Sequence, residues 1–275
     1  MRPNLLCGIA LIGACCSAGE IGAASPTPLQ PAGKWIVDYA ADQCTLSRNY
    51  GSEARPLMLV FEKVPLTHGV GLYVIRVSKR ADMNSGKGRI DPPGEEPKAA
   101  SFLAYNVTTG DLRIIGSGVD QSVVRDAARN GQVTIDFPGE VNELFAVPNL
   151  AAAFAALDDC AMDLGRSWGI PIEQQRLVAT PATPAQPLDK VFSASDYPAA
   201  AQRADEMGRI KVRIAVDTSG RATSCTLSRP SGSKSLDEAT CRILMKRTQY
   251  KPALDAKGDP VASYFVTTVA WLLEG

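Results

Sequence analysis

Alternating apolar and polar residues between positions 210 and 216 predict a β-strand. The apolar side chains fall on one face and the basic Lys211 and Arg213 on the other. A period of two is typical of a strand with one buried face. The following Asp217-Thr218-Ser219-Gly220 favours a tight turn. A second strand over 222–228 is therefore expected to pair back as a hairpin.

The residues that follow the hairpin predict a helix and a last strand. Ser235 and Glu238 fit a capping box at a helix start, and Leu236, Ala239 and Ile243 supply an apolar stripe. The run 262–273 is dense in β-branched and aromatic residues, which favours a strand. The C-terminal third is thus expected to form a two-layer α/β sandwich whose last strand is exposed.

The sequence upstream of this region predicts several strands followed by one long helix. A stretch rich in Gly, Pro and charge, 79–98, is expected to be a long loop or hairpin tip. After Pro148, apolar residues recur at steps of three and four from Leu150 to Trp168, and Gly169 follows, which predicts a helix. Strands are expected over 35–39, 57–61, 70–77, 102–107, 112–115 and 132–137. The expected architecture is an antiparallel sheet with the helix across one face.

Length and composition favour two small folded domains. The chain has 275 residues and a formal net charge of zero, so the basic footprint of a nucleic-acid-binding protein is absent. We expect an α+β fold with an N-terminal domain over 33–172 and a C-terminal domain over 190–274. A Pro-containing linker over 173–189 would join them.

The N-terminus predicts an export signal over residues 1–24. A basic start is followed by an apolar core of about a dozen residues, which is short for a membrane span. Small residues before Ser25 suit cleavage. Ile12-Gly13-Ala14-Cys15 also resembles a bacterial lipobox, in which Cys15 would be lipidated and attach the protein to a membrane. Export by either route predicts a periplasmic or envelope location.

The cysteines outside the signal predict two disulfides. Four remain, and an even number suits an oxidising compartment. Four cysteines allow three connectivities, of which the domain arrangement favours Cys225–Cys241 and Cys44–Cys160. Buried free thiols are the alternative. No metal or cofactor site is predicted, since no CxxC pair and only one histidine are present.

Five short motifs in the C-terminal third resemble the C-terminal domain of the TonB family. The resemblance covers residues 190–273 and nothing upstream. The motifs are Tyr197-Pro198, Val216-Asp217-x-x-Gly220-Arg221, Ser231-Gly232-Ser233 with Leu236-Asp237, Tyr250-x-Pro252-Ala253, and Gly258-x-Pro260-Val261.

The resemblance implies a non-enzymatic, protein-binding role in a Gram-negative envelope. In that family a receptor segment adds as a strand beside the domain's last strand, so that main-chain hydrogen bonds supply affinity. The partner would be an envelope protein, with the periplasmic segment of an outer-membrane receptor as one candidate. A second copy of the chain could pair through the same edge. The implied partner-binding residues are Tyr264, Val266, Thr268 and Ala270.

Energy transduction for outer-membrane transport is the first alternative. The transducing members of the family carry Gln-Pro-x before Tyr-Pro, where this chain has Ala194, Ser195 and Asp196. A transducer also needs a retained membrane helix and a long Pro-rich spacer, whereas Thr180 to Pro187 spans only a few tens of Å. These departures favour a binding module over a transducer.

An envelope hydrolase with its site in the upstream domain is the second alternative. It would use His68, the single histidine, as a base beside a hydroxyl nucleophile. No residue pattern orients His68, so no catalytic residue is predicted.

Overall fold

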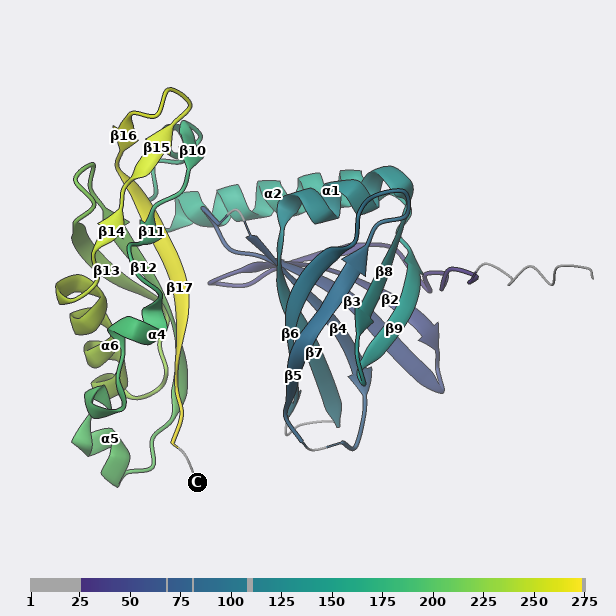
Figure 1. Ribbon diagram of the computed structural model, residues 1–275, viewed down its shortest axis with the longest axis horizontal. Coiled ribbons are helices and arrows are strands. Elements are labelled where there is room, and N and C mark those ends of the chain that lie inside the picture. The colour runs from purple at the N-terminus through teal and green to yellow at the C-terminus, as the bar shows by residue number, and fades with distance from the viewer. Residues whose placement is uncertain (1–25, 68, 81, 108–110, 274–275) are drawn as a thin grey trace, which may run out of the picture.

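The computed structural model describes residues 26–67, 69–80, 82–107 and 111–273. In this part of the chain, two hydrophobic cores form around two separate sheets. We call the first unit, with its sheet and two helices, the N-terminal domain, and the second the C-terminal domain (Figure 1). The α+β class predicted from the sequence is confirmed. The predicted boundaries at 172 and 190 stay predictions.

The N-terminal domain is a curled, nine-stranded antiparallel sheet with order β1-β2-β3-β4-β7-β6-β5-β8-β9. The helices α1 (Gln121–Asn130) and α2 (Leu150–Ser167) lie together at one end of it (Figure 1). The strands are β1 (Ile36–Tyr39), β2 (Cys44–Ser52), β3 (Arg55–Lys63), β4 (Gly69–Val77), β5 (Asn84–Asp91), β6 (Lys98–Val107), β7 (Leu112–Asp120), β8 (Gln132–Phe137) and β9 (Val141–Ala146).

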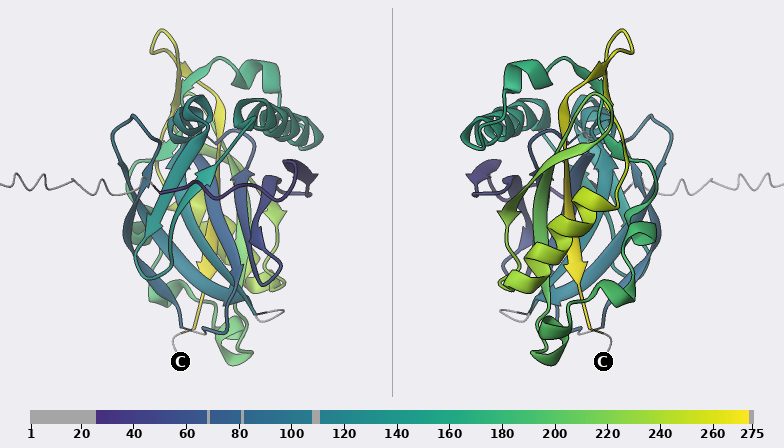
Figure 2. Two further views of the ribbon diagram at one scale, coloured as in Figure 1. Left: turned by 90° about the vertical axis from the view of Figure 1, so that its right-hand side faces the viewer. Right: turned by 90° about the vertical axis from the view of Figure 1, so that its left-hand side faces the viewer.

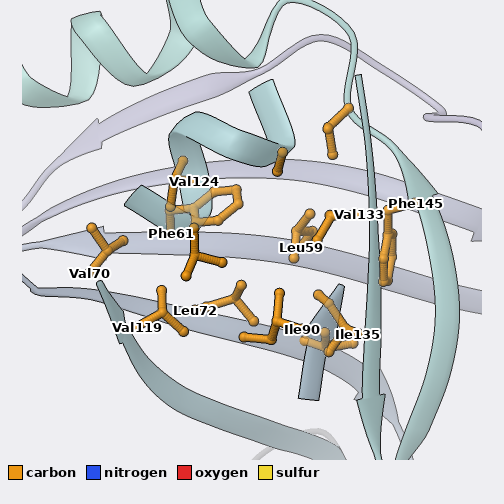
Figure 3. Close-up of a cluster of buried hydrophobic side chains, with 14 of the residues drawn as sticks. Leu59, Phe61, Val70, Leu72, Ile90, Val119, Val124, Val133, Ile135 and Phe145 are labelled. Atoms are coloured by element: carbon orange, nitrogen blue, oxygen red, sulfur yellow. The ribbon is translucent and has the colours of Figure 1, made fainter. Parts of the chain in front are cut away.

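The inward face of this sheet carries the first core. Figure 3 shows side chains from distant strands meeting there, among them Phe61 of β3, Leu72 of β4 and Phe145 of β9. All three are at most 1% exposed. A disulfide joins Cys44 of β2 to Cys160 of α2. The predicted long helix is therefore present and is tied to the sheet as expected.

The prediction of a long loop or hairpin tip over 79–98 is wrong, because strand β5 lies within this range and pairs with both β6 and β8. Its inward positions include Gly86 and Gly88 in place of apolar side chains. A Cβ on Gly88 would lie 2.3 Å from the Asp136 carbonyl oxygen and 2.7 Å from the Phe137 ring. Glycine thus makes room for the stacked rings of Phe102 and Phe137, 5.1 Å apart. Strands β2 and β9 and helix α1 are further elements that the hydrophobic pattern does not predict.

The C-terminal domain is built on a three-stranded antiparallel sheet with order β13-β12-β17. Its parts are β12 (Gly208–Val216), β13 (Ala222–Arg229), α6 (Lys234–Lys246) and β17 (Ser263–Trp271). Helix α6 covers one face of the sheet (Figure 2, right). It begins two residues earlier than the capping box predicts. Ser233 is the N-cap and its hydroxyl accepts from the Leu236 amide, so Ser235 lies within the helix.

Short elements surround this sheet. They are α3 (Ile172–Gln175), β10 (Val178–Thr180), β11 (Thr183–Pro184), α4 (Leu188–Val191), the 3-10 turn η1 (Ala194–Asp196), α5 (Ala199–Arg203), β14 (Tyr250–Lys251), β15 (Ala253–Asp255) and β16 (Pro260–Val261). Within the segment expected to be a linker, β10 pairs with β15 and β11 pairs with β14. That segment therefore packs on the C-terminal domain.

Candidate protein-interaction edge

The last strand, β17, has a partner on one side only. It pairs with β12 over its whole length, from Ser263 opposite Val216 to Trp271 opposite Gly208, and no other described strand adjoins it. Between Tyr264 and Ala270, the backbone makes no hydrogen bond to described residues other than those to β12. An unpaired edge of this kind offers a row of N–H and C=O groups to an incoming strand.

The start of this edge is occupied by a side chain. Gln175 of α3 donates to the Ala262 carbonyl at 3.2 Å and accepts from the Ser263 hydroxyl at 2.7 Å. The free stretch therefore begins at Tyr264.

The predicted partner-binding residues Tyr264, Val266, Thr268 and Ala270 lie on one face of β17. Their partners across the ladder are Ala215, Arg213, Lys211 and Arg209 of β12. This face looks toward the N-terminal domain, and the opposite face packs against α6 (Figure 1). Thr268 and Ala270 are exposed, and Tyr264 and Val266 are half-buried. Their role in binding stays a prediction.

A hollow of about 350 Å³ lies on the helix side of this edge. It is formed by the segment from α4 to Tyr197 on one side and by the end of β17 on the other. The rings of Phe192 and Tyr197 meet Trp271 edge-on, with centroids 5.8 and 5.3 Å away. These edge-to-face contacts give the hollow an apolar aromatic wall, against which an apolar side chain of a partner can pack.

A second and larger hollow, of about 730 Å³, separates the two domains. Tyr73 and Tyr105 of the N-terminal sheet line it on one side, and Arg209 and Lys211 of β12 on the other. The Tyr73 ring packs against Gly116, where a Cβ would come within 2.6 Å of it. Burial and the neighbouring Glu62 carboxylate raise the pKa of the Tyr73 hydroxyl. Thr268 lines both hollows.

Charged side chains join the two domains beside this second hollow, which we call the interdomain groove. Lys211 of β12 lies 3.2 Å from Asp42 and 3.3 Å from Glu62, and its ammonium donates to Gln43 at 2.6 Å. Arg229 of β13 pairs with the same Asp42 at 2.8 Å. The polar face of the β12–β13 hairpin is therefore held against the N-terminal sheet.

Cation–π contacts extend the domain contact along β12. The Arg213 guanidinium lies over the rings of Trp168 and Tyr264, 5.4 and 5.5 Å from their centroids. Burial holds the pKa of Arg213 below its usual value. Arg209 lies 5.8 Å from the Tyr105 centroid. Its side chain makes no hydrogen bond or ion pair with the described residues.

The motif residues shape the hairpin turn at one end of the sheet. Gly220 has φ +80°, and a Cβ there would come within 2.2 Å of the Tyr250 carbonyl oxygen. The Asp217 carboxylate accepts from the amides of Ser219 and Arg221 at 2.9 Å each. The Ser219 hydroxyl also donates to this carboxylate, at 2.6 Å, and together with the two amides it holds the pKa of Asp217 down at about 2. Glycine is thus required for the turn to approach β14 so closely.

The other motif residues hold β14, β15 and the last strand in place. Tyr197 donates to the Glu206 carbonyl at 2.6 Å while its ring meets Trp271. Pro198 precedes α5, and Ala253 is fully buried. Pro252 lies 3.4 Å from the Cβ position of Gly220. The motifs therefore build the sheet and its last strand.

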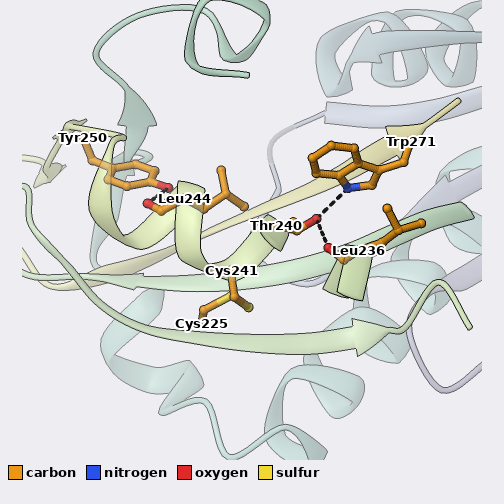
Figure 4. The surroundings of a disulfide bond; sticks show 7 residues. All are labelled: Cys225, Leu236, Thr240, Cys241, Leu244, Tyr250 and Trp271. Carbon is orange, nitrogen blue, oxygen red and sulfur yellow. Dashed lines mark hydrogen bonds between the residues drawn. A yellow bond between two sulfur atoms is a disulfide. The ribbon is translucent and has the colours of Figure 1, made fainter. Parts of the chain in front are cut away.

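A disulfide and a buried hydrogen bond fix α6 between the outer strands (Figure 4). Cys225 of β13 is joined to Cys241 of α6, as predicted. On the other side of the helix, the Trp271 indole donates to Thr240 at 2.8 Å, and Thr240 donates to the Leu236 carbonyl. The position of β17 is thus set by α6 as well as by β12.

The possible lipidation site Cys15 and the candidate base of the hydrolase alternative, His68, lie outside the described residues. In the described ranges, no group of three or more His, Cys, Asp or Glu side chains is arranged to hold a metal ion. No helix there has the length and apolar content needed to cross a bilayer.

An extended peptide can add as a further strand to a sheet whose last strand has a free edge, as β17 has. Residues 193–273 match the family model of the Gram-negative bacterial TonB protein C-terminal domain. The resemblance predicted from the motifs is confirmed. In that family the domain is a non-enzymatic, envelope-associated protein-interaction module. No curated protein matches the chain.

The sequence pattern missed two residues beside the edge, Arg209 and Phe192. Arg209 extends the alternation of Lys211 and Arg213 by one step, so its place on the same face could have been read from the sequence. Phe192 belongs to the segment before Tyr197, and its contact with Trp271 joins positions 79 residues apart. No local signal predicts such a contact.

Proposed function

We propose that this protein is exported to the cell envelope and binds another envelope protein by adding a strand of the partner to β17. The observation that carries the proposal is the unpaired edge of β17 in a domain of the TonB C-terminal type. Main-chain hydrogen bonds along 264–270 would supply affinity, and side-chain hollows beside them would supply selectivity. A second copy of the chain is an alternative occupant of the same edge.

The N-terminal domain supports this proposal by holding the sheet without covering the edge. It packs on the face of β12 and β13 through Lys211 and Arg229, while β17 keeps its free side. A partner strand would therefore meet a preformed edge, which lowers the entropy cost of binding.

A proline scan along β17 tests the strand addition. Successive amides point alternately to β12 and to the free edge. Proline at an outward-facing amide would leave the ladder intact and block the partner. Among Val266→Pro, Thr267→Pro and Thr268→Pro, the variants that keep the wild-type melting temperature are the informative ones.

The readout is photo-cross-linking in cells. A photoreactive residue at Thr268 is expected to label an envelope protein, whereas the same residue at Arg242, exposed on the outer face of α6, is not. A well-folded proline variant should lose the label. If every folded proline variant keeps the label, strand addition is wrong.

Energy transduction is the second candidate function, and the match of the C-terminal domain favours it. It requires the N-terminal segment to stay attached as an anchor. Mass spectrometry of the mature protein separates the two, because a mature N-terminus near Ser25 or a lipidated Cys15 ends the transducer proposal.

A further inference from the structure

The free edge of β17 lies between two hollows of opposite character. The helix-side hollow is lined by Phe192, Tyr197 and Trp271, and the interdomain groove contains Arg209; the two meet at Thr268. Side chains of a strand point alternately to its two faces. A strand added here would therefore direct successive residues into different surroundings.

Among the described residues, the groove has one positive charge that no carboxylate neutralises. Of its three cations, Lys211 and Arg229 are paired with Asp42 and Glu62. The exposed Arg209 side chain makes a cation–π contact with Tyr105 and lies near the Tyr73 hydroxyl, and among the described residues no carboxylate pairs with it. Three cations against two carboxylates leave a surplus of one, so the groove is suited to an anionic side chain.

Arg209 is also within reach of an added strand. It lies opposite Ala270 in the β12–β17 ladder, and the small alanine side chain leaves the way over β17 open. Neighbouring strands are about 4.8 Å apart, so the added strand would run roughly 10 Å from β12. An extended arginine and a carboxylate side chain can span that gap together.

We propose that the β17 edge selects a partner strand in which an acidic residue faces Arg209 and the adjacent residues are apolar and enter the hollow at Trp271. This inference rests on the proposed strand addition and adds the chemistry of the partner. It gives the N-terminal domain a part in recognition, because the groove exists only between the two domains.

The test uses nine-residue peptides of alternating Thr and Leu with blocked ends, whose central Thr is replaced by Glu, Gln or Lys. Binding to the full chain is measured by calorimetry. We expect the Glu peptide to bind roughly five- to tenfold more tightly than the Lys peptide. Replacing the two Leu residues beside the Glu by Asn should weaken binding by about tenfold.

Charge reversal in the protein provides the matched comparison. R209E should reverse the preference so that the Lys peptide binds more tightly. R242E, the same change on the exposed face of α6, should leave the preference as in the wild type. Arg209 is exposed, so its replacement is not expected to impair folding.

Peptide N-methylation separates this inference from the proposed function. Strand addition predicts that methylating every second amide abolishes binding while methylating the others does not. If that alternation is seen but Glu, Gln and Lys peptides bind equally, or R209E keeps the wild-type preference, the inference alone is overturned. If no peptide binds, or if the loss of binding does not alternate between successive methylated amides, strand addition is wrong and the inference fails with it.

Discussion

Lys211 of β12 and Asp42, which precedes β2, form an ion pair whose side chains are only 6% and 7% exposed. The pair lies between the two domains, on the face of the C-terminal sheet that the N-terminal domain covers. With α6 on one face and the N-terminal domain on the other, the outer edges of β13 and β17 are the parts of the described sheet left for a partner.

Replacing Lys211 by Met is expected to destabilise the protein by about 3 kcal/mol, because the buried charge of Asp42 and the half-buried charge of Glu62 would have fewer partners. Urea denaturation measures the loss. Lys234→Met is the control, since Lys234 is 89% exposed and lies 3.7 Å from Glu238, and it should cost less than about 1 kcal/mol. Equal losses in the two variants would contradict a buried interdomain pair.

Removing each disulfide by a double Cys→Ala change is expected to lower stability by different amounts. The loop closed by Cys225 and Cys241 spans 16 residues and that closed by Cys44 and Cys160 spans 116. The chain-entropy model gives about 3 kcal/mol for the first and between about 4 and 5 for the second. Urea midpoints measured without reductant show which removal costs more stability. A larger loss on removing Cys225–Cys241 would contradict the chain-entropy expectation.

Gly220→Ala is expected to cost more than about 2 kcal/mol, because the new methyl group would meet the Tyr250 carbonyl in addition to the strain of positive φ. Gly232→Ala is a matched control, since Gly232 has φ +93° and open space around its Cβ position. It should cost about 1–2 kcal/mol. Thermal melts of both variants test this, and equal shifts would rule out the close approach.

Asp217→Asn tests the turn by its pH dependence. The folded-state pKa of Asp217 is held at about 2, below the ordinary value of 3.8. Its charge therefore contributes stability that is fully present above pH 4 and is lost as the pH falls through 2. The melting temperatures of wild type and variant should differ above pH 4 and converge near pH 2. A difference that grows toward low pH would contradict this sign.

Local patterns were enough to predict much of the C-terminal domain. The alternation over 210–216, the turn at Asp217 to Gly220 and the last strand depend on near neighbours, and the structure contains all three. The helix start was missed by two residues because several serines compete there and Ser233 also donates to Glu206. The role of the β17 residues in binding remains a prediction.

The sequence by itself determined the α+β class, the order of the motifs and the two disulfide pairs, because each depends on local spacing or on a small number of cysteines. Only the tertiary structure decided that β5 is a strand, since its inward glycines are matched by Phe102 and Phe137 from other strands. It alone also decided what covers the polar face of β12. A lysine in an alternating strand looks the same whether it meets water or, as Lys211 does, Glu62 from 149 residues away.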